Sequence, residues 1–219
     1  MSPHSRLLTV LALLCLAPAA HAQYYGNDQD SRPVRWYVMG GYVEPVGFTG
    51  NILQGGYNFG VGAAMRQPGS PLALRLEFNY TNNNATRYLL QQAESQTGLQ
   101  ITGGWGETFS LSANGEYRVP FGNGSYGYII AGIGGYYTRI SLTEYGYGYV
   151  CNPWWGYCYL ATGEAVVASH EVTKFGWNAG AGVSFALGGG PTLFVEARYT
   201  EISMPTNIEF VPINIGIRF

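Results

Sequence analysis

Charged side chains are scarce in this 219-residue chain: Asp, Glu, Lys and Arg make up 11% of it, and the formal net charge is −2. Such a chain lacks the basic surface that a nucleic-acid partner requires. No segment after the first 22 residues has the roughly 18 unbroken apolar residues of a membrane helix. Glycine and tyrosine are abundant instead, with 32 and 18 copies. This composition favours β-structure.

The first 22 residues have the features of a cleaved secretory signal. Arg6 precedes a short apolar stretch, LLTVLALLCLA, and the small-x-small motif AHA ends at Ala22. These features predict cleavage between Ala22 and Gln23. The mature chain would then comprise residues 23–219, a length that suits one domain.

Cysteine is also rare, with three copies. Cys15 lies in the predicted signal, where lipidation would be the alternative, but the bulky Leu14 stands where such signals need a small residue. Cys151 and Cys158 remain, in the segment CNPWWGYC. In an exported protein this pair predicts a disulfide. The alternative, a metal site, would need two further ligands.

Apolar and polar residues alternate to the end of the chain, NIEFVPINIGIRF. This period of two predicts a β-strand with one apolar and one polar face. The apolar positions are Val211, Ile213, Ile215, Ile217 and Phe219, and Pro212, Asn214, Gly216 and Arg218 lie between them. The same pattern predicts eight strands near 33–44, 55–66, 71–81, 105–120, 126–140, 170–187, 192–203 and 208–219.

The connections between these strands alternate in length. QPGSP, FGNGS and GGGP are short and rich in turn residues, whereas the stretches 82–104 and 141–169 are long. Short turns at one end and long loops at the other indicate an all-β, eight-stranded antiparallel up-and-down barrel. The fifth strand is apolar on both sides, so the sequence does not show which of its sides faces the lumen.

The content of the two faces indicates what surrounds the barrel. The polar face carries arginine and glutamate among many glycines, which suits a narrow lumen because small residues make room for large ones. The apolar face places aromatics toward both strand ends, as a bilayer-spanning barrel needs at its two interfaces. They are Trp36, Tyr117, Phe121, Tyr126 and Phe219 at one end and Tyr42, Tyr57, Tyr80, Phe109, Phe175, Trp177 and Tyr199 at the other. A soluble ligand-binding barrel with inward apolar faces is the alternative.

The segments FGWNAGAGVSF, FVEARYTEI and IEFVPINIGIRF resemble the last strands of the OmpA-like and OmpX-like superfamily of eight-stranded outer-membrane barrels. The resemblance implies a monomer in the bacterial cell outer membrane, in contact with its lipid and lipopolysaccharide, with short turns and both termini in the periplasm. It places 82–104 and 141–169 outside the cell. It also implies that Phe219 belongs to a C-terminal signal for the outer-membrane assembly machinery.

Two groups of residues are candidate sites. Charged side chains on the polar face are predicted to form ion pairs that fill the lumen, because an unpaired buried charge is costly. They are Arg75, Glu77, Glu116, Arg118, Lys174, Glu196 and Arg198. The loop aromatics Trp154, Trp155 and Tyr157 are candidates for contact with a protein or sugar partner, or they pack on one another or on lipopolysaccharide.

Catalytic chemistry has few candidates. His170 is the single histidine of the predicted mature chain, and its neighbours Ser169 and Glu171 point to the opposite face of a strand. No local motif matches the Ser/His/acid triad of the outer-membrane lipid A deacylases. We therefore expect no catalytic residues and no cofactor. The predicted role is structural presentation of surface loops, in envelope integrity, adhesion or surface interaction. A narrow pore and a lipid A-modifying enzyme are the alternatives.

Overall fold

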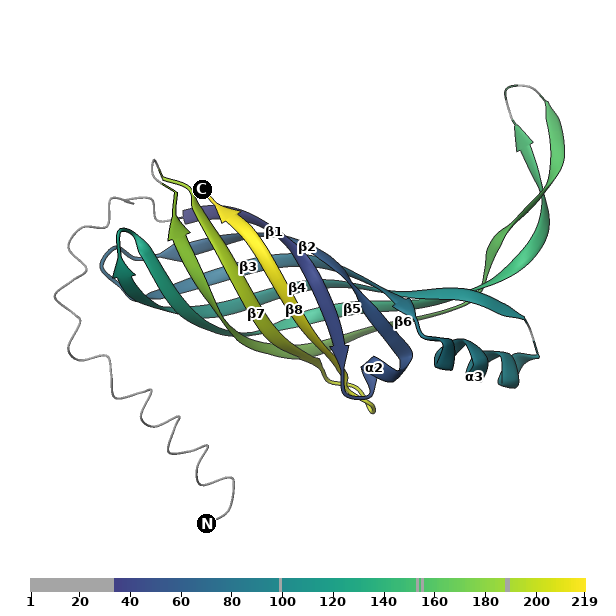
Figure 1. Ribbon diagram of the computed structural model, residues 1–219, viewed down its shortest axis with the longest axis horizontal. Coiled ribbons are helices and arrows are strands. Elements are labelled where there is room, and N and C mark those ends of the chain that lie inside the picture. Colours follow the sequence, from purple (N-terminus) through teal and green to yellow (C-terminus); the bar gives the residue numbers. More distant parts are fainter. Residues whose placement is uncertain (1–33, 99, 153, 155, 188–189) are drawn as a thin grey trace, which may run out of the picture.

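The computed structural model describes residues 34–219 except 99, 153, 155, 188 and 189, and it is a closed barrel of eight strands (Figure 1). All neighbouring strands are antiparallel, and β8 pairs with β1 to close the barrel. The strands are β1 (Val34–Val46), β2 (Leu53–Arg66), β3 (Leu72–Ala85), β4 (Ile101–Gly122), β5 (Ser125–Asn152), β6 (Tyr157–Ala186), β7 (Thr192–Ile202) and β8 (Ile208–Arg218). The predicted fold class is confirmed. The predicted cleavage site, Ala22 and Gln23, lies outside the described residues.

Side chains alternate between the lumen and the outer surface, and the apolar face is the outer one. On β8, Ile213 and Ile215 are 50% and 55% exposed, whereas Asn214 is 3% and Arg218 0% exposed. Period-two alternation in a closed barrel leaves only these two environments. The polar face therefore lies inside, as predicted.

The structure decides the facing of β5. Tyr126, Tyr128 and Ile130 form a buried cluster inside the barrel. Ile129 and Ile133 on the other face are exposed. The prediction that Tyr126 belongs to the outer aromatic band is therefore wrong. Apolar residues occupy both faces of this strand, so its sequence does not show which face points outward.

The outer aromatics meet one another at the end of the long connections. Tyr80 and Phe109 have ring centroids 5.0 Å apart, and Phe109 and Tyr137 continue the row at 6.2 Å. Trp177 and Tyr199 form a similar pair at 5.5 Å. Aromatic rings at this end of the barrel suit a membrane interface, because one side of the ring can face lipid while the other faces water.

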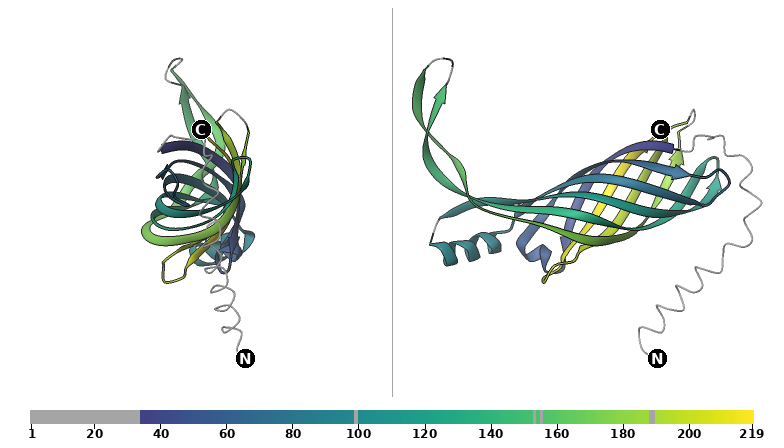
Figure 2. Two further views of the ribbon diagram at one scale, coloured as in Figure 1. Left: turned by 90° about the vertical axis from the view of Figure 1, so that its left-hand side faces the viewer. Right: turned by 180° about the vertical axis from the view of Figure 1, so that it is seen from behind.

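The stretch 141–169 is mostly strand, which corrects its prediction as a loop. β5 and β6 stay paired up to Asn152 and Tyr157. At roughly 3.3 Å per residue, the part of β5 from Ser141 to its end extends up to about 40 Å. We call residues 141–169 the long hairpin; it stands clear of the barrel at the end away from the C-terminus (Figures 1 and 2).

A helix corrects the prediction of a loop at 82–104. α3 (Arg87–Thr97) begins after Thr86, whose side chain accepts a hydrogen bond from the Leu89 N–H at 3.3 Å. It ends at Gly98, whose φ of +70° is a left-handed cap that glycine adopts without strain. No helix of the described part of the chain is long and apolar enough to span a membrane.

Candidate functional site in the lumen and on the long hairpin

Three strands each contribute an acid and a base two positions apart to one buried cluster. Residues two apart on a strand share a face, so each pair points into the lumen. We call this cluster the lumen network. It consists of Arg75 and Glu77 on β3, Glu116 and Arg118 on β4, Glu196 and Arg198 on β7, and Arg218 on β8, and every member is at most 7% exposed.

Arg75 is the centre of the lumen network, because its guanidinium reaches all three glutamates. It lies 2.5 Å from Glu77, 3.0 Å from Glu116 and 2.8 Å from Glu196. Its Nε also donates to the Tyr37 hydroxyl at 3.1 Å. One buried cation thus joins carboxylates from three strands.

The other arginines complete the pairing of the carboxylates. Arg198 binds Glu77 and Glu196, with an Nη2 to Oε1 distance of 2.7 Å to Glu77. Arg118 and Arg218 both bind Glu116, the latter at 3.2 Å. Four arginines against three glutamates give the lumen network a formal net charge of +1.

Glycines on neighbouring strands make room for large aromatic side chains in the lumen. A Cβ at Gly182 would lie 2.5 Å from Cζ of Tyr128, and one at Gly216 would lie 2.6 Å from Cε1 of Phe194. Real Cβ atoms do not approach so closely. The glycines that interrupt the polar faces are therefore sites of close approach.

Two residues of the polar face differ from their expected roles. Lys174 is not part of the lumen network: its side chain is exposed, and no ion pair joins it to another described residue. It has the lumen phase, opposite Tyr136, but it lies where β7 has ended and the barrel wall is open. Arg218 is part of the network although it was not among the predicted ion pairs. The alternation of apolar and polar residues in the last strand was the sequence signal that placed Arg218 on the lumen face.

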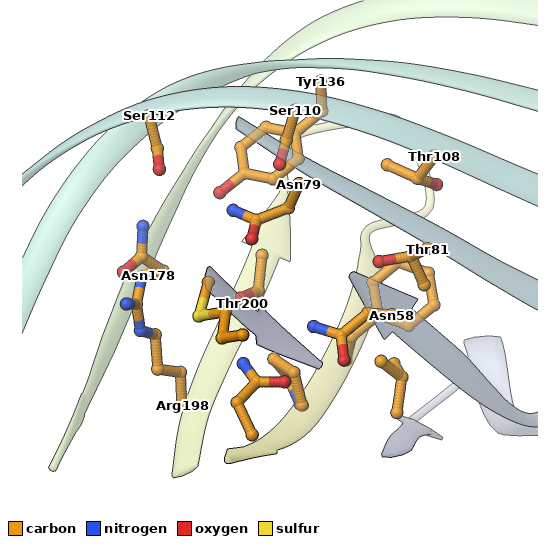
Figure 3. Close-up of a pocket in the computed structure, with 15 residues that line it drawn as sticks. Asn58, Asn79, Thr81, Thr108, Ser110, Ser112, Tyr136, Asn178, Arg198 and Thr200 are labelled. Carbon is orange, nitrogen blue, oxygen red and sulfur yellow. The ribbon is translucent and has the colours of Figure 1, made fainter. Parts of the chain in front are cut away.

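A small polar cavity lies beside the lumen network, and Arg198 of that network is part of its lining (Figure 3). Its volume is about 50 Å³, enough for a few water molecules. Asparagine, serine and threonine side chains from several strands line it, among them Asn58, Asn79, Ser110, Asn178 and Thr200.

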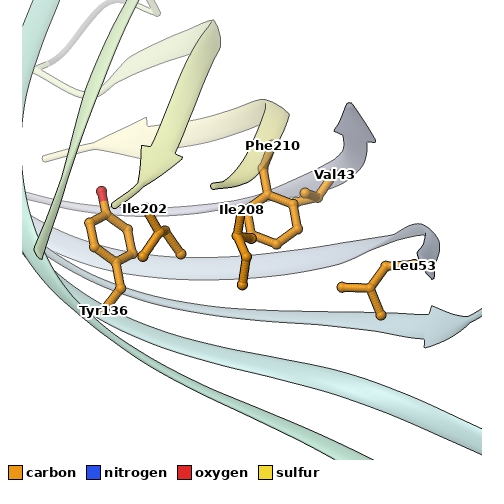
Figure 4. Packing of buried hydrophobic residues seen from close by; sticks show 6 residues of the cluster. All are labelled: Val43, Leu53, Tyr136, Ile202, Ile208 and Phe210. Carbon is orange, nitrogen blue, oxygen red and sulfur yellow. The ribbon is translucent and has the colours of Figure 1, made fainter. Parts of the chain in front are cut away.

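An apolar cluster packs inside the barrel and contributes Val43, Tyr136 and Phe210 to the lining of this cavity (Figure 4). We call it the lumen plug: Val43, Leu53, Tyr136, Ile202, Ile208 and Phe210, all at most 6% exposed. The short helix α2 (Thr49–Ile52) covers it, with Ile52 packed against the cluster. Buried Thr49 accepts the Glu209 N–H at 2.9 Å, which ties α2 to β8.

Near the tip of the long hairpin, Cys151 and Cys158 lie opposite each other on β5 and β6 and form a disulfide. Trp154 is 91% and Tyr157 54% exposed at the same tip. Trp155 lies outside the described residues. The structure thus places two of the three predicted contact residues on the surface.

Removing the disulfide by changing both Cys151 and Cys158 to Ser is expected to loosen the tip while leaving the barrel intact. Closing so small a ring stabilises it by about 2.5 kcal/mol in the chain-entropy model, so local opening should rise by up to about 60-fold. The check is the rate of chymotrypsin cleavage at the tip in detergent. Reducing agent should accelerate cleavage of the wild type alone, and equal rates for both proteins would contradict the expectation.

His170 follows the long hairpin on β6, and its neighbour Ser169 lies on the opposite face of the strand. It is exposed and pairs across the strands with Ile140, while Ser169 pairs with Ser141. Within the described residues, no three His, Cys, Asp or Glu side chains are placed to hold a metal ion.

Two solved structures illustrate the likeness in fold. Neisserial surface protein A (NspA) is 15% identical over 85% of this chain and 96% of its own, with a TM-score of 0.53. A major outer membrane protein from Thermus thermophilus is 15% identical over 86% of this chain and 100% of its own, with a TM-score of 0.50. No curated protein matches the sequence.

A family model extends the likeness from fold to sequence. The model described as the outer membrane protein beta-barrel domain matches residues 7–219. The match includes every described strand and both candidate regions, the lumen network and the long hairpin. The chain belongs to the outer membrane protein beta-barrel domain family.

Proposed function

We propose that this protein is a non-enzymatic surface barrel of the bacterial outer membrane, which holds the long hairpin and α3 outside the cell. Membership of the family indicates the outer membrane. The asymmetry of the barrel carries the proposal: tight turns and the C-terminus lie at one end, and the long hairpin and α3 at the other (Figure 2). Outer-membrane barrels keep short turns in the periplasm and longer connections outside.

The filled lumen supports a structural role over that of a pore. Any solute would have to pass both the lumen network and the lumen plug, and an eight-stranded barrel has an interior just wide enough for side chains. The position of His170, whose neighbour Ser169 points to the opposite face of the strand, supports a role without catalysis.

In this proposal the outer surface meets lipid and lipopolysaccharide, and the tip of the long hairpin meets a host or surface ligand. The contacts would be Trp154, Trp155 and Tyr157, since exposed aromatics bury a large area at small entropic cost. The barrel is a monomer. Phe219, whose N–H donates to the Trp36 carbonyl at 2.9 Å, would be read by the assembly machinery.

Labelling with a membrane-impermeant maleimide tests the orientation. Two probes, Ser95→Cys in α3 and Gln67→Cys in the β2–β3 turn, are placed separately in the variant without Cys151 and Cys158. We expect intact cells to label Ser95→Cys, and Gln67→Cys to react only after the outer membrane is opened. The reverse pattern would reject the orientation, and recovery of the chain without detergent would reject the membrane barrel.

A further inference from the structure

Positive charge is in surplus at the end of the lumen that carries the tight turns. Three buried arginines lie at this end, Arg35, Arg118 and Arg218. Glu116 is the one described carboxylate that binds Arg118 or Arg218, and it also binds Arg75. One carboxylate is therefore shared by three guanidinium groups. Arg35, whose Nη2 donates to the Arg218 carbonyl at 3.2 Å, adds a further positive charge beside them.

Several hydrogen-bond donors at the same end are unused within the described part of the chain. Arg118 binds Glu116 through its Nε, and its two terminal nitrogens make no hydrogen bond to another described residue. The Nε of Arg218 and the hydroxyls of Ser184 and Thr192 are buried and have no partner among the described residues either. A buried donor without an acceptor costs free energy. What this end of the lumen lacks is therefore an acceptor.

These donors gather around one side chain, Tyr126. Ser184 pairs with Tyr126 across β5 and β6, and Thr192 pairs with Arg218 across β7 and β8. The Cζ atoms of Arg118 and Arg218 lie 4.6 and 5.9 Å from the centroid of the Tyr126 ring, and Arg218 also donates to its hydroxyl. We call Arg118, Arg218, Ser184 and Thr192 the turn-end site.

The chemistry of the turn-end site favours an anion with several oxygens. A guanidinium group binds phosphate or carboxylate through paired hydrogen bonds, because its terminal nitrogens match the spacing of two oxygens. A cation would be repelled, and a neutral ligand would leave the surplus charge uncompensated. The site faces the lumen, whereas in the proposed membrane barrel lipid meets the outer face of the strands. The ligand that fits is therefore a small, water-soluble oxyanion.

We propose that the turn-end site binds such an oxyanion, a phosphate or carboxylate group of a water-soluble molecule that enters from the turn end. Arg118 contributes its two terminal nitrogens, and Arg218, Ser184 and Thr192 contribute one donor each. The inference rests on the proposed function for the compartment that supplies the ligand, the periplasm, and for the exclusion of lipid. Binding itself is a property of the isolated barrel. The lumen network fills the barrel beyond the site, so the ligand is held and not conducted.

The test titrates inorganic phosphate into the isotope-labelled protein in neutral detergent micelles and follows the backbone amide signals by NMR. We expect saturable shifts at Arg118, Tyr126, Ser184 and Thr192. Sodium chloride at the same ionic strength should give no saturable shift there, because screening acts on all exposed charges alike. An anionic phospholipid added to the micelles should leave these amides unchanged, which separates a soluble phosphate from a lipid headgroup.

Two variants and a matched control then identify the donors. Arg118→Lys keeps the charge that binds Glu116 but removes the paired nitrogens, and it should weaken phosphate binding about tenfold or more. Ser184→Ala should weaken binding about threefold without a change of charge. Arg139→Lys, at the other end of the barrel, should leave it unchanged.

The shifts in the unaltered protein locate the site even where a variant does not fold. Absence of saturation, an equal response to chloride, shifts confined to other residues, a response of these amides to the phospholipid, or equal affinities of Arg118→Lys and Arg139→Lys would each overturn the proposal. None of these outcomes depends on the labelling of intact cells, which tests the orientation separately.

Discussion

Replacing Arg75 with methionine is expected to lower the free energy of unfolding by about 3–5 kcal/mol, because it leaves buried carboxylates without their shared cation. Glu77, Glu116 and Glu196 would retain Arg118, Arg198 and Arg218, but they would lose the one side chain that contacts all three. Methionine fills much of the same volume, so the loss of stability measures the removal of the charge and not the creation of a cavity. Urea unfolding in lipid vesicles, followed by tryptophan fluorescence, measures the change.

The surface pair between Arg139 and Glu171 is the matched control. Both side chains are about half exposed, so Arg139→Met should change the stability by at most about 1 kcal/mol. Equal effects of the two substitutions would mean that water screens the lumen network as it does the surface pair.

Replacing Ile215 with arginine is expected to destabilise the inserted barrel by about 2–4 kcal/mol, the cost of a cation on the lipid face near the bilayer midplane. Ile215 lies on the outer face of β8 at the middle of the barrel wall, opposite Gly40 and Val195. The same urea titration in vesicles measures the effect.

Val166→Arg on the long hairpin is the control for this substitution. Val166 is 52% and Ile215 55% exposed, so a water-exposed surface would tolerate both changes equally. In the proposed membrane barrel only Ile215 faces lipid, and Val166→Arg should change the stability by no more than about 0.5 kcal/mol. Equal, small effects at both positions would reject a lipid environment around the barrel wall.

The two misassigned connections show different limits of sequence reasoning. α3 had local signals at both ends, Thr86 as N-cap and Gly98 as the left-handed cap, and the absence of a strong apolar face hid it. For the long hairpin the obstacle was length, because a membrane barrel needs only about 9–11 residues per strand. The alternation of tyrosine and glycine before Cys151 already had the period of a strand.

Lys174 shows why phase alone does not predict environment. It shares the face of the lumen residues on β6, yet it lies beyond the end of β7, so water reaches it. Phase is a property of one strand, whereas burial depends on how far the neighbouring strands extend. The sequence pattern therefore shows on which face of its strand a residue lies, but it does not show whether neighbouring strands bury that residue.

The sequence by itself determined the strands of the barrel wall and the types of residue on their two faces, because period-two alternation and glycine content are local properties. It predicted the outward direction of the apolar faces but left that of β5 open. Only the tertiary structure decided which charges meet. Arg75 reaches Glu196 across 121 positions, and Arg218 reaches Glu116 across 102. Closure of β8 on β1 sets these contacts, because they depend on the register between distant segments.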